Sequence, residues 1–271
     1  MDILLVGASA REHALAWKFA ESRKTGTIYT TSPYAGVDTL ADHWSGTVDA
    51  WRAAHPDGIV IGERDGRRSP AEDAEIRLSL PCLYDGKTLL PLPAVQLGPE
   101  PGTACAPAAL PETVREDLLS RVVLPWLQGQ EARGVFCFGF SGDDAPQLVS
   151  IHEGFGGMEA MAVLPMLRGE LMALLLACDT GRLDGLSLQT NGTVTVVLPY
   201  RTAVGAPLFG LSRIAMNTGF FIGAAEKREE RLFALDPVPL YICGRASNPD
   251  AAKAAAQAAI AVLSENGPEI S

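Results

Sequence analysis

The stretch of residues 1–17 constrains the fold of this chain more than any other. Residues 2–6 form a short aliphatic run, which predicts a fully buried strand. The small residues 7–10 allow a tight turn, and residues 11–20 have the composition of a helix. A strand, a small-residue turn and a helix together predict a Rossmann-like unit. The start of such a helix favours an anion, because its first N–H groups have no partner within the helix.

Composition narrows the class of protein. The chain has 271 residues, 47% of them hydrophobic, and a formal net charge of −10, which argues against binding to DNA or RNA because polyphosphates need a basic surface. Since no apolar run is long enough to span a bilayer and the N-terminus enters a strand, we expect neither a transmembrane helix nor a signal peptide. The 5 cysteines include no Cys-x-x-Cys pair, so we expect reduced thiols in a cytoplasmic protein, with no disulfide frame or zinc site.

Hydrophobic periodicity predicts most of the remaining elements. The predicted strands are residues 27–30, 58–62, 135–141, 147–151 and 193–198, and the predicted helices are residues 48–54, 111–128 and 249–263. Residues 84–96 are predicted to form a hairpin, and Asp85-Gly86 favours a type I′ turn because both residues tolerate positive φ.

The exact residues at positions 6–18 are more informative than their hydrophobic pattern. These residues read VGASAREHALAWK, which resembles the start of phosphoribosylamine–glycine ligase (glycinamide ribonucleotide synthetase), an ATP-grasp enzyme of purine synthesis. The family has two glycines before the arginine, where this chain has Ser9 and Ala10. Further motifs similar to those of the family follow in the same order. They include Asp85-Gly86-Lys87, Leu164-Pro165-Met166-Leu167 and a leucine-rich helix at residues 171–183. The resemblance covers most of the chain, around one large internal deletion.

The resemblance implies an α/β protein with three parts. These are a trimmed Rossmann-like N-terminal domain (residues 1–70), a remnant ATP-grasp large subdomain (71–186) and a small C-terminal α+β domain (187–271). The glycine-rich lid that covers ATP in the family has no counterpart, because the sequence passes from Ser69-Pro70 to residues 74–80, which resemble a strand beyond that lid.

The family's magnesium ligands are also replaced. Magnesium bridges phosphate oxygens during phosphoryl transfer, and the family provides carboxylate and amide oxygens to hold it. Where the family motif has glutamate, asparagine, arginine and aspartate, this chain has Ser150, His152, Gly154 and Gly157. The resemblance therefore implies no bound metal or cofactor, and no useful affinity for Mg·ATP.

A few other residues admit a chemical interpretation. His152 with Glu159 would supply half of a transition-metal site, although a hydrogen-bonded histidine beside a solvated glutamate is favoured; Glu153 faces the other side of the strand. Cys105 is conceivable as a nucleophile, but a buried or loop thiol without function is favoured. His13 is expected to pack from its helix onto the sheet.

We expect the binding site at the strand–turn–helix junction. The candidate binding residues are Gly7, Ser9 and Arg11 at the junction, Gly36 in the loop after the second strand, and Gln96. Gln96 is what remains of a Gln-Asp-His-Lys word that precedes the family's substrate loop. Arg11, at the helix start, is the candidate for a phosphate contact, and no catalytic residue is assigned.

Three functions remain open. The first is a degenerate phosphoribosylamine–glycine ligase homologue that binds a phosphoribosyl-type or related small anionic ligand without ATP-dependent ligation. The second is a working enzyme, either a ligase completed by a partner chain or one with ATP-independent chemistry in the old substrate pocket. The third is a structural or regulatory subunit. Loss of the lid would expose the surface beneath it, so we also expect a homodimer or a protein partner.

Overall fold

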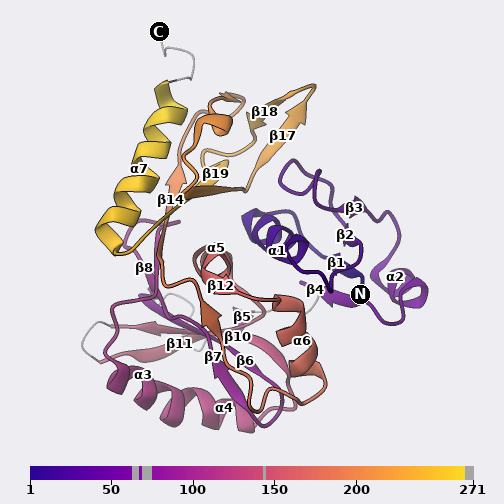
Figure 1. The fold of residues 1–271 in the computed structure, drawn as a ribbon, viewed down its shortest axis with the longest axis vertical. Coiled ribbons are helices and arrows are strands. Elements are labelled where there is room, and N and C mark those ends of the chain that lie inside the picture. Colours follow the sequence, from indigo (N-terminus) through magenta and orange to yellow (C-terminus); the bar gives the residue numbers. More distant parts are fainter. Residues whose placement is uncertain (63–66, 69–74, 143–144, 266–271) are drawn as a thin grey trace.

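The computed structural model describes residues 1–62, 67–68, 75–142 and 145–265 (Figure 1). It confirms a mixed α/β fold, in which a parallel four-stranded sheet lies beside an antiparallel ten-stranded sheet. Two small sheets, of two and three strands, complete the fold. Within the described ranges, no helix is both long and apolar enough to cross a membrane.

The N-terminal unit is built around strand β1, whose three aliphatic side chains are fully buried. Its elements are β1 (Ile3–Leu5), α1 (Ala10–Ala20), β2 (Ile28–Thr30), β3 (Asp42–His43), α2 (Val48–Ala54) and β4 (Ile59–Ile61). The strands are parallel in the order β3-β2-β1-β4, so β1 is the point at which the chain switches to the other side of the sheet. The Rossmann-like unit predicted from the sequence is therefore confirmed.

The ten-stranded sheet joins the middle of the chain to its C-terminal part. Its order is β16-β19-β14-β9-β8-β6-β10-β11-β5, with β7 paired to β6. The strands of the middle part are β5 (Arg67–Arg68), β6 (Leu78–Tyr84), β7 (Leu89–Pro91), β8 (Val95–Leu97), β9 (Ala104–Ala106), β10 (Gly134–Ser141) and β11 (Gln147–Glu153). Because β14 pairs with β9, one continuous sheet crosses the domain boundary expected at residues 186–187.

The predicted hairpin at residues 84–96 forms between β6 and β7, but its turn differs from the prediction. Tyr84 pairs with Leu89, which leaves a four-residue connection, and of Asp85 and Gly86 only Gly86 has a positive φ. The Asp85 carboxylate instead accepts hydrogen bonds from the backbone N–H groups of Lys87, Thr88 and Leu183. Burial opposes ionisation of this carboxyl, but these N–H groups outweigh it and lower its pKa. Asp85 therefore fixes the turn by accepting hydrogen bonds.

Helices cover both faces of the middle of this sheet (Figure 1). The helix predicted over residues 111–128 consists of α3 (Glu112–Leu118), a π-helical turn (Leu119–Val123) and α4 (Leu124–Gln128). The turn widens because Pro125 has no N–H to donate to the carbonyl one α-turn earlier. On the other face lie α5 (Gly157–Val163), a 3₁₀ turn (Leu164–Met166) and α6 (Leu171–Asp179).

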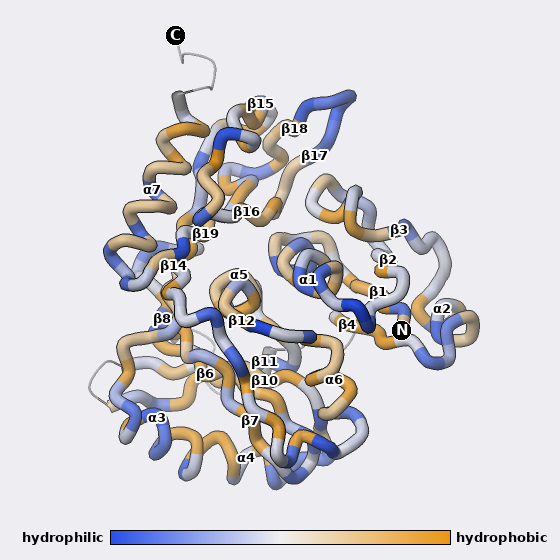
Figure 2. Tube along the Cα trace, in the orientation of Figure 1, coloured by the Kyte–Doolittle hydropathy of each residue, from blue (hydrophilic) through white to orange (hydrophobic). Residues whose placement is uncertain are grey.

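The C-terminal part adds β14, β16 and β19 to the same sheet and a long covering helix. Its elements are β13 (Gln189–Thr190), which pairs with β12 (Leu167–Arg168) from before α6, then β14 (Val194–Tyr200), β15 (Pro207–Leu208), a 3₁₀ turn (Leu211–Arg213), β16 (Thr218–Ile222), β17 (Ala225–Arg228), β18 (Arg231–Ala234), β19 (Leu240–Ala246) and α7 (Pro249–Glu265). Helix α7 packs on β19 and β14, and Gly244 permits this approach because a side chain there would meet the backbone of Ala252 and Ala256. Figure 2 shows that the tip of the β17–β18 hairpin is hydrophilic.

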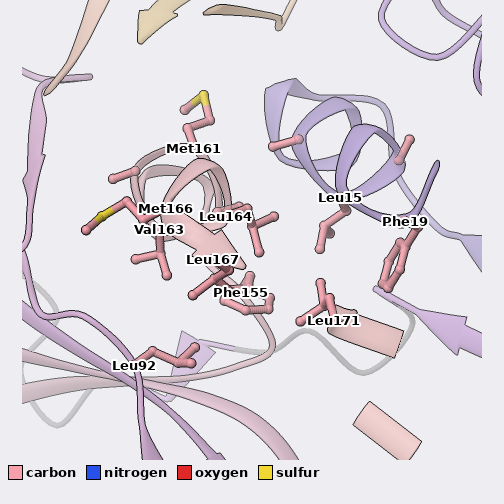
Figure 3. Packing of buried hydrophobic residues seen from close by; sticks show 14 of the residues in the cluster. Leu15, Phe19, Leu92, Phe155, Met161, Val163, Leu164, Met166, Leu167 and Leu171 are labelled. Carbon is pink, nitrogen blue, oxygen red and sulfur yellow. The ribbon is translucent and has the colours of Figure 1, made fainter. Parts of the chain in front are cut away.

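Helix α1 lies at the centre of the largest apolar cluster and connects the parts of the molecule. It packs against α5, α6 and β16, which follow it by more than a hundred residues in the chain. In Figure 3, Leu15 and Phe19 of α1 point toward Leu171 and Leu164, and all four side chains are buried. The buried Lys18 donates from Nζ to the carbonyl of Leu167 at 2.7 Å. Apolar packing and this hydrogen bond therefore hold the second half of α1 in place.

Candidate functional site

The candidate site lies at the carboxyl ends of β1, β2 and β4, where α1 begins. Open parallel sheets bind ligands at such a switch point, because two loops diverge there and leave a crevice. Gly7 follows β1 with φ +132°, and Gly62 follows β4 with φ +98°. A side chain at Gly62 would meet the carbonyl of Val6, and its first carbon would lie 3.3 Å from Nη2 of Arg11. The two glycines thus allow the strand ends and the helix start to approach one another.

Ser9 begins helix α1 as its N-cap residue. Its backbone is extended, and its Oγ accepts a hydrogen bond from the N–H of Arg11 at 3.2 Å. The same hydroxyl donates to Oε2 of Glu12 at 2.6 Å. Ser9 therefore satisfies one of the free N–H groups of the helix and also holds a carboxylate above its first turn.

Arg11 and Glu12 form a tight ion pair at the start of α1. Nε of Arg11 donates to Oε1 of Glu12 at 2.6 Å, and Nη2 lies 2.5 Å from the same oxygen. The exposed fraction of the side chain is 16% for Arg11 and 3% for Glu12, so the pair is buried with the arginine toward solvent. The carboxylate of Glu12 also lies beside Gly7, where a Cβ would be 2.8 Å from its Cδ.

The loop after β2 covers this helix start. The hydroxyl of Tyr34 donates to the carbonyl oxygen of Ser9 at 2.5 Å, which brings the loop containing Gly36 beside the junction. Gly36 is buried against the Tyr34 ring. A Cβ added at Gly36 would lie 2.5 Å from the nearest carbon of that ring. Burial, and then the negative charge of Glu12, raise the pKa of Tyr34. Tyr34 therefore remains a neutral hydrogen-bond donor at this site.

Four of the five predicted binding residues come together in this region, and one does not. Gly7, Ser9 and Arg11 form the junction, and Gly36 joins it through Tyr34. Gln96 instead lies on β8 of the ten-stranded sheet, where its Nε2 donates to the carbonyl oxygen of Arg77 at 2.8 Å. Helix α5 packs against both β8 and α1, so it separates the strand that carries Gln96 from the helix that begins at the junction. Gln96 is a local strand contact in this structure.

Three further residues belong to this site, and the sequence alone does not assign them to it. These are Glu12, Tyr34 and Gly62. Glu12 had a usable signal, because Ser9 followed by a glutamate three residues later is the pattern of a helix capping box. Tyr34 and Gly62 have no such local signal, since their roles depend on loops from separate strands.

His13 contacts a different sheet from the one it was expected to meet. Its Nδ1 accepts a hydrogen bond from the backbone N–H of Ile222 in β16 at 2.9 Å, and its ring lies edge-on to Phe220 and Phe221. Burial lowers the pKa of His13 to about 4, so the ring is neutral near pH 7 with its proton on Nε2. His13 therefore attaches the candidate site's helix to the C-terminal part of the chain.

The junction between β11 and α5 contains the residues that stand, by the sequence resemblance, at the family's metal-ligand positions. Nδ1 of His152 lies 3.1 Å from the carbonyl oxygen of Gly154, and Ser150 is buried beside Gly139 on the neighbouring strand. Glu159 folds back over Gly156 at the start of α5. Within the described parts of the chain, no group of three histidine, cysteine, aspartate or glutamate side chains is placed to hold a metal ion.

The five cysteines are free thiols, and Cys105 is half-buried on β9. Burial raises the pKa of Cys105, which disfavours the thiolate that a nucleophile needs. A separate open cleft of about 390 Å³ is lined by Ser22, Thr25 and Asp38 among others. This cleft lies at the amino end of β2, opposite to Arg11, and includes none of the predicted site residues.

Solved structures define the class to which this fold belongs. Phosphoribosylamine–glycine ligase from Thermotoga maritima superposes with a TM-score of 0.72 and 13% identity, covering 99% of this chain and 97% of that chain. The phosphoribosylaminoimidazole carboxylase ATPase subunit from Aquifex aeolicus superposes with a TM-score of 0.63 and 9% identity, covering 97% of this chain and 100% of that chain. At these identities the likeness shows the fold alone, which this chain shares with both of these proteins.

Sequence matches identify the relatives more narrowly. Residues 1–65 match the family of the phosphoribosylglycinamide synthetase N domain. Phosphoribosylamine–glycine ligase from Rhizobium meliloti is 28% identical over 245 residues, 80% of this chain and 56% of that protein. The same ligase from Brucella melitensis is 31% identical over 186 residues, 61% of this chain and 40% of that protein. The predicted resemblance to phosphoribosylamine–glycine ligase is confirmed, and the chain spans about half the length of these relatives.

Proposed function

We propose that this chain binds a phosphoribosyl-type or related small phosphorylated ligand at the β1–α1 junction and does not carry out ATP-dependent ligation. The observation that carries the proposal is the convergence of the Arg11 guanidinium, the Ser9 hydroxyl and the start of α1 beside Gly7 and Gly62. In proteins generally, helix N-termini and guanidinium groups are common binding partners for phosphate. The relationship to phosphoribosylamine–glycine ligases favours a phosphoribosyl compound over other anions.

The second half of the proposal, the absence of ligation, rests on what replaces the ATP site. Ser150, His152 and Gly157 stand where the resemblance places oxygen ligands for magnesium, and Nδ1 of His152 lies 3.1 Å from the carbonyl oxygen of Gly154. Strand β5 pairs with the edge of the large sheet at β11, and β6 begins ten positions after β5 ends, which leaves little chain for a lid. In the described parts of the chain, no group of three metal-ligating side chains is placed to hold the metal. The sequence has no counterpart of the family's glycine-rich lid for the triphosphate, so we do not expect phosphoryl transfer.

A thermal-shift titration with ribose 5-phosphate tests the binding site. The ligand should raise the melting temperature of the wild type. Arg11→Ala should weaken binding by roughly ten- to hundred-fold, because that is the change in affinity expected for the loss of one charge-assisted hydrogen bond. Arg115→Ala is a matched control, since Arg115 also pairs with a nearby glutamate but lies on α3. If ribose 5-phosphate shifts wild type and Arg11→Ala equally, Arg11 is not part of the site; if it shifts neither, the proposal is wrong.

Calorimetry with Mg·ATP tests the second half. We expect no saturable heat at micromolar concentration and no glycine-dependent release of ADP from the pure protein. Saturable binding in that range, or ADP release, would contradict the proposal and support a working ligase.

The predicted homodimer or protein partner remains part of this proposal. Among the described residues, the large apolar side chains that are exposed are Met1, Leu186, Val204, Met216 and Leu235, all outside helices and strands. Light scattering over a wide concentration range measures the mass directly. A monomer mass throughout, with no protein captured in pull-downs, would count against this part of the proposal.

A further inference from the structure

The carboxylate of Glu12 occupies the same place in which a phosphate ligand would be expected. Glu12 is 2% exposed, although isolated buried carboxylates are costly. It is stabilised there by the Ser9 hydroxyl at 2.6 Å and by Arg11 Nε at 2.6 Å, close to the positive end of α1. These groups are the same ones that the proposed function assigns to the ligand. The protein's own side chain therefore shows that this cradle accepts an anion.

Gly7 is what makes room for this arrangement. Any side chain at position 7 would put a carbon 2.8 Å from Cδ of Glu12, closer than van der Waals contact allows. In dinucleotide-binding folds, a glycine after the first strand lets a ligand's phosphate approach the backbone. Here Gly7 instead accommodates the carboxylate of Glu12, from the helix that follows it.

We propose that Glu12 is a tethered competitor for the anion site, so that a phosphorylated ligand binds only by displacing its carboxylate from Arg11. This inference rests on the proposed function and adds regulation to it. Arg11, with 16% of its side chain exposed, lies on the solvent side of the pair and can meet a ligand while the buried carboxylate withdraws. Until that exchange occurs, the negative charge of Glu12 cancels the charge of Arg11 and repels a phosphate.

The competing account is that Glu12 only caps the helix. A capping glutamate stabilises the fold and has no effect on ligand affinity beyond keeping the site folded. A tethered competitor makes the opposite prediction, because removing its charge should improve binding. The two accounts are therefore separated by the sign of one change in affinity.

The test is calorimetry with inorganic phosphate and with ribose 5-phosphate on wild type, Glu12→Gln and Glu131→Gln. Glu12→Gln keeps the shape of the side chain and removes the charge, and we expect it to bind both probes at least about ten-fold more tightly than wild type. Glu131→Gln makes the same change of charge at an exposed residue after α4 and should leave the affinity unchanged. Equal or weaker binding by Glu12→Gln would overturn the inference.

A second variant covers the case in which Glu12→Gln does not fold. Glu12→Asp keeps the charge but draws it back from Arg11, so it should also bind more tightly than wild type, by a smaller factor. If wild type binds and Arg11→Ala does not, but neither Glu12 variant gains affinity, the proposed function stands and the competitor is wrong. If no variant binds either probe, the proposed function itself fails.

Discussion

The two junctions in which a strand leads into a helix, β1–α1 and β11–α5, share one device and differ in its surroundings. In each, a glutamate at the third helical position folds back over a glycine at the junction: Glu12 over Gly7, and Glu159 over Gly156. In α1 the N-cap is a serine whose hydroxyl bonds the helix, and the second helical residue is Arg11. In α5 the N-cap is Gly156, which has no side-chain cap, and the second residue is Met158.

This difference shows which feature distinguishes a candidate binding site from ordinary packing. A folded-back glutamate occurs at both helix starts, so it does not by itself indicate a ligand. Only the β1–α1 junction adds a cation and a hydroxyl on the same carboxylate, and only there does the helix stand at the switch point of a parallel sheet. The β11–α5 junction is also where the sequence resemblance places the family's metal ligands, at positions that hold Ser150, His152 and Gly157 in this chain.

The largest expected effect comes from a side chain at the first glycine. Gly7→Ala places a Cβ against the Glu12 carboxylate and forces a non-glycine residue into φ +132°, so we expect a loss of about 1–3 kcal/mol from the backbone alone. Gly156→Ala is the matched change in the other junction. Its φ of −69° suits any residue and it meets only the end of a flexible side chain, so it should cost less than about 1 kcal/mol. Equal losses in urea unfolding would show that the two junctions are equivalent.

The two helices also differ in how they are attached to the C-terminal strands. Helix α5 receives a hydrogen bond at the Met161 carbonyl from Sγ of Cys243, a thiol whose pKa is raised by burial. Helix α1 is attached through His13, whose pKa burial lowers to about 4. A histidine that is neutral in the folded state and titrates near 6.5 when unfolded contributes stability that is present above pH 6.5 and is lost as the pH falls toward 4.

We therefore expect acid to weaken the wild type by about 2–3 kcal/mol more than a His13→Gln variant between pH 6.5 and 4. Glutamine can accept the same N–H of Ile222 without titrating in this range. The free energy of unfolding, measured by urea at several pH values, gives the two curves. Parallel curves for wild type and variant would mean that His13 is not the titrating attachment.

Local sequence was enough to predict the elements that carry the site. The aliphatic run before Gly7 and the small residues after it indicate a strand, a turn and a helix, and the structure has β1 and α1 there. These features are local, because a buried parallel strand must be apolar on both faces. Gly7, Ser9 and Arg11 follow from the same pattern, since each is fixed by its position relative to the helix start.

Contacts between distant segments could not be predicted in this way. The acceptor of the Ile222 N–H is His13, which is 209 positions away, and Asp85 accepts from Leu183, 98 positions away. The prediction of Gln96 as a site residue rests on its resemblance to a family motif. In the structure, the register of β8 against β6 puts Gln96 beside Arg77 instead. The type I′ turn was predicted from two residues, whereas the turn that forms depends on a third segment reaching Asp85.

The smallest effect concerns the Ser9 hydroxyl, which has no equivalent in α5. Ser9→Ala removes a helix cap, which costs about 1 kcal/mol in general, and here it also removes a donor from the buried Glu12 carboxylate. Thr47→Ala is the matched control, because Thr47 caps α2 by accepting from Ala50 at 3.1 Å and is exposed. We expect Ser9→Ala to lower the urea midpoint more than Thr47→Ala, with the same dependence on denaturant. If the two losses are equal, the hydroxyl acts as a cap alone, and the carboxylate of Glu12 is held in place by Arg11 without it.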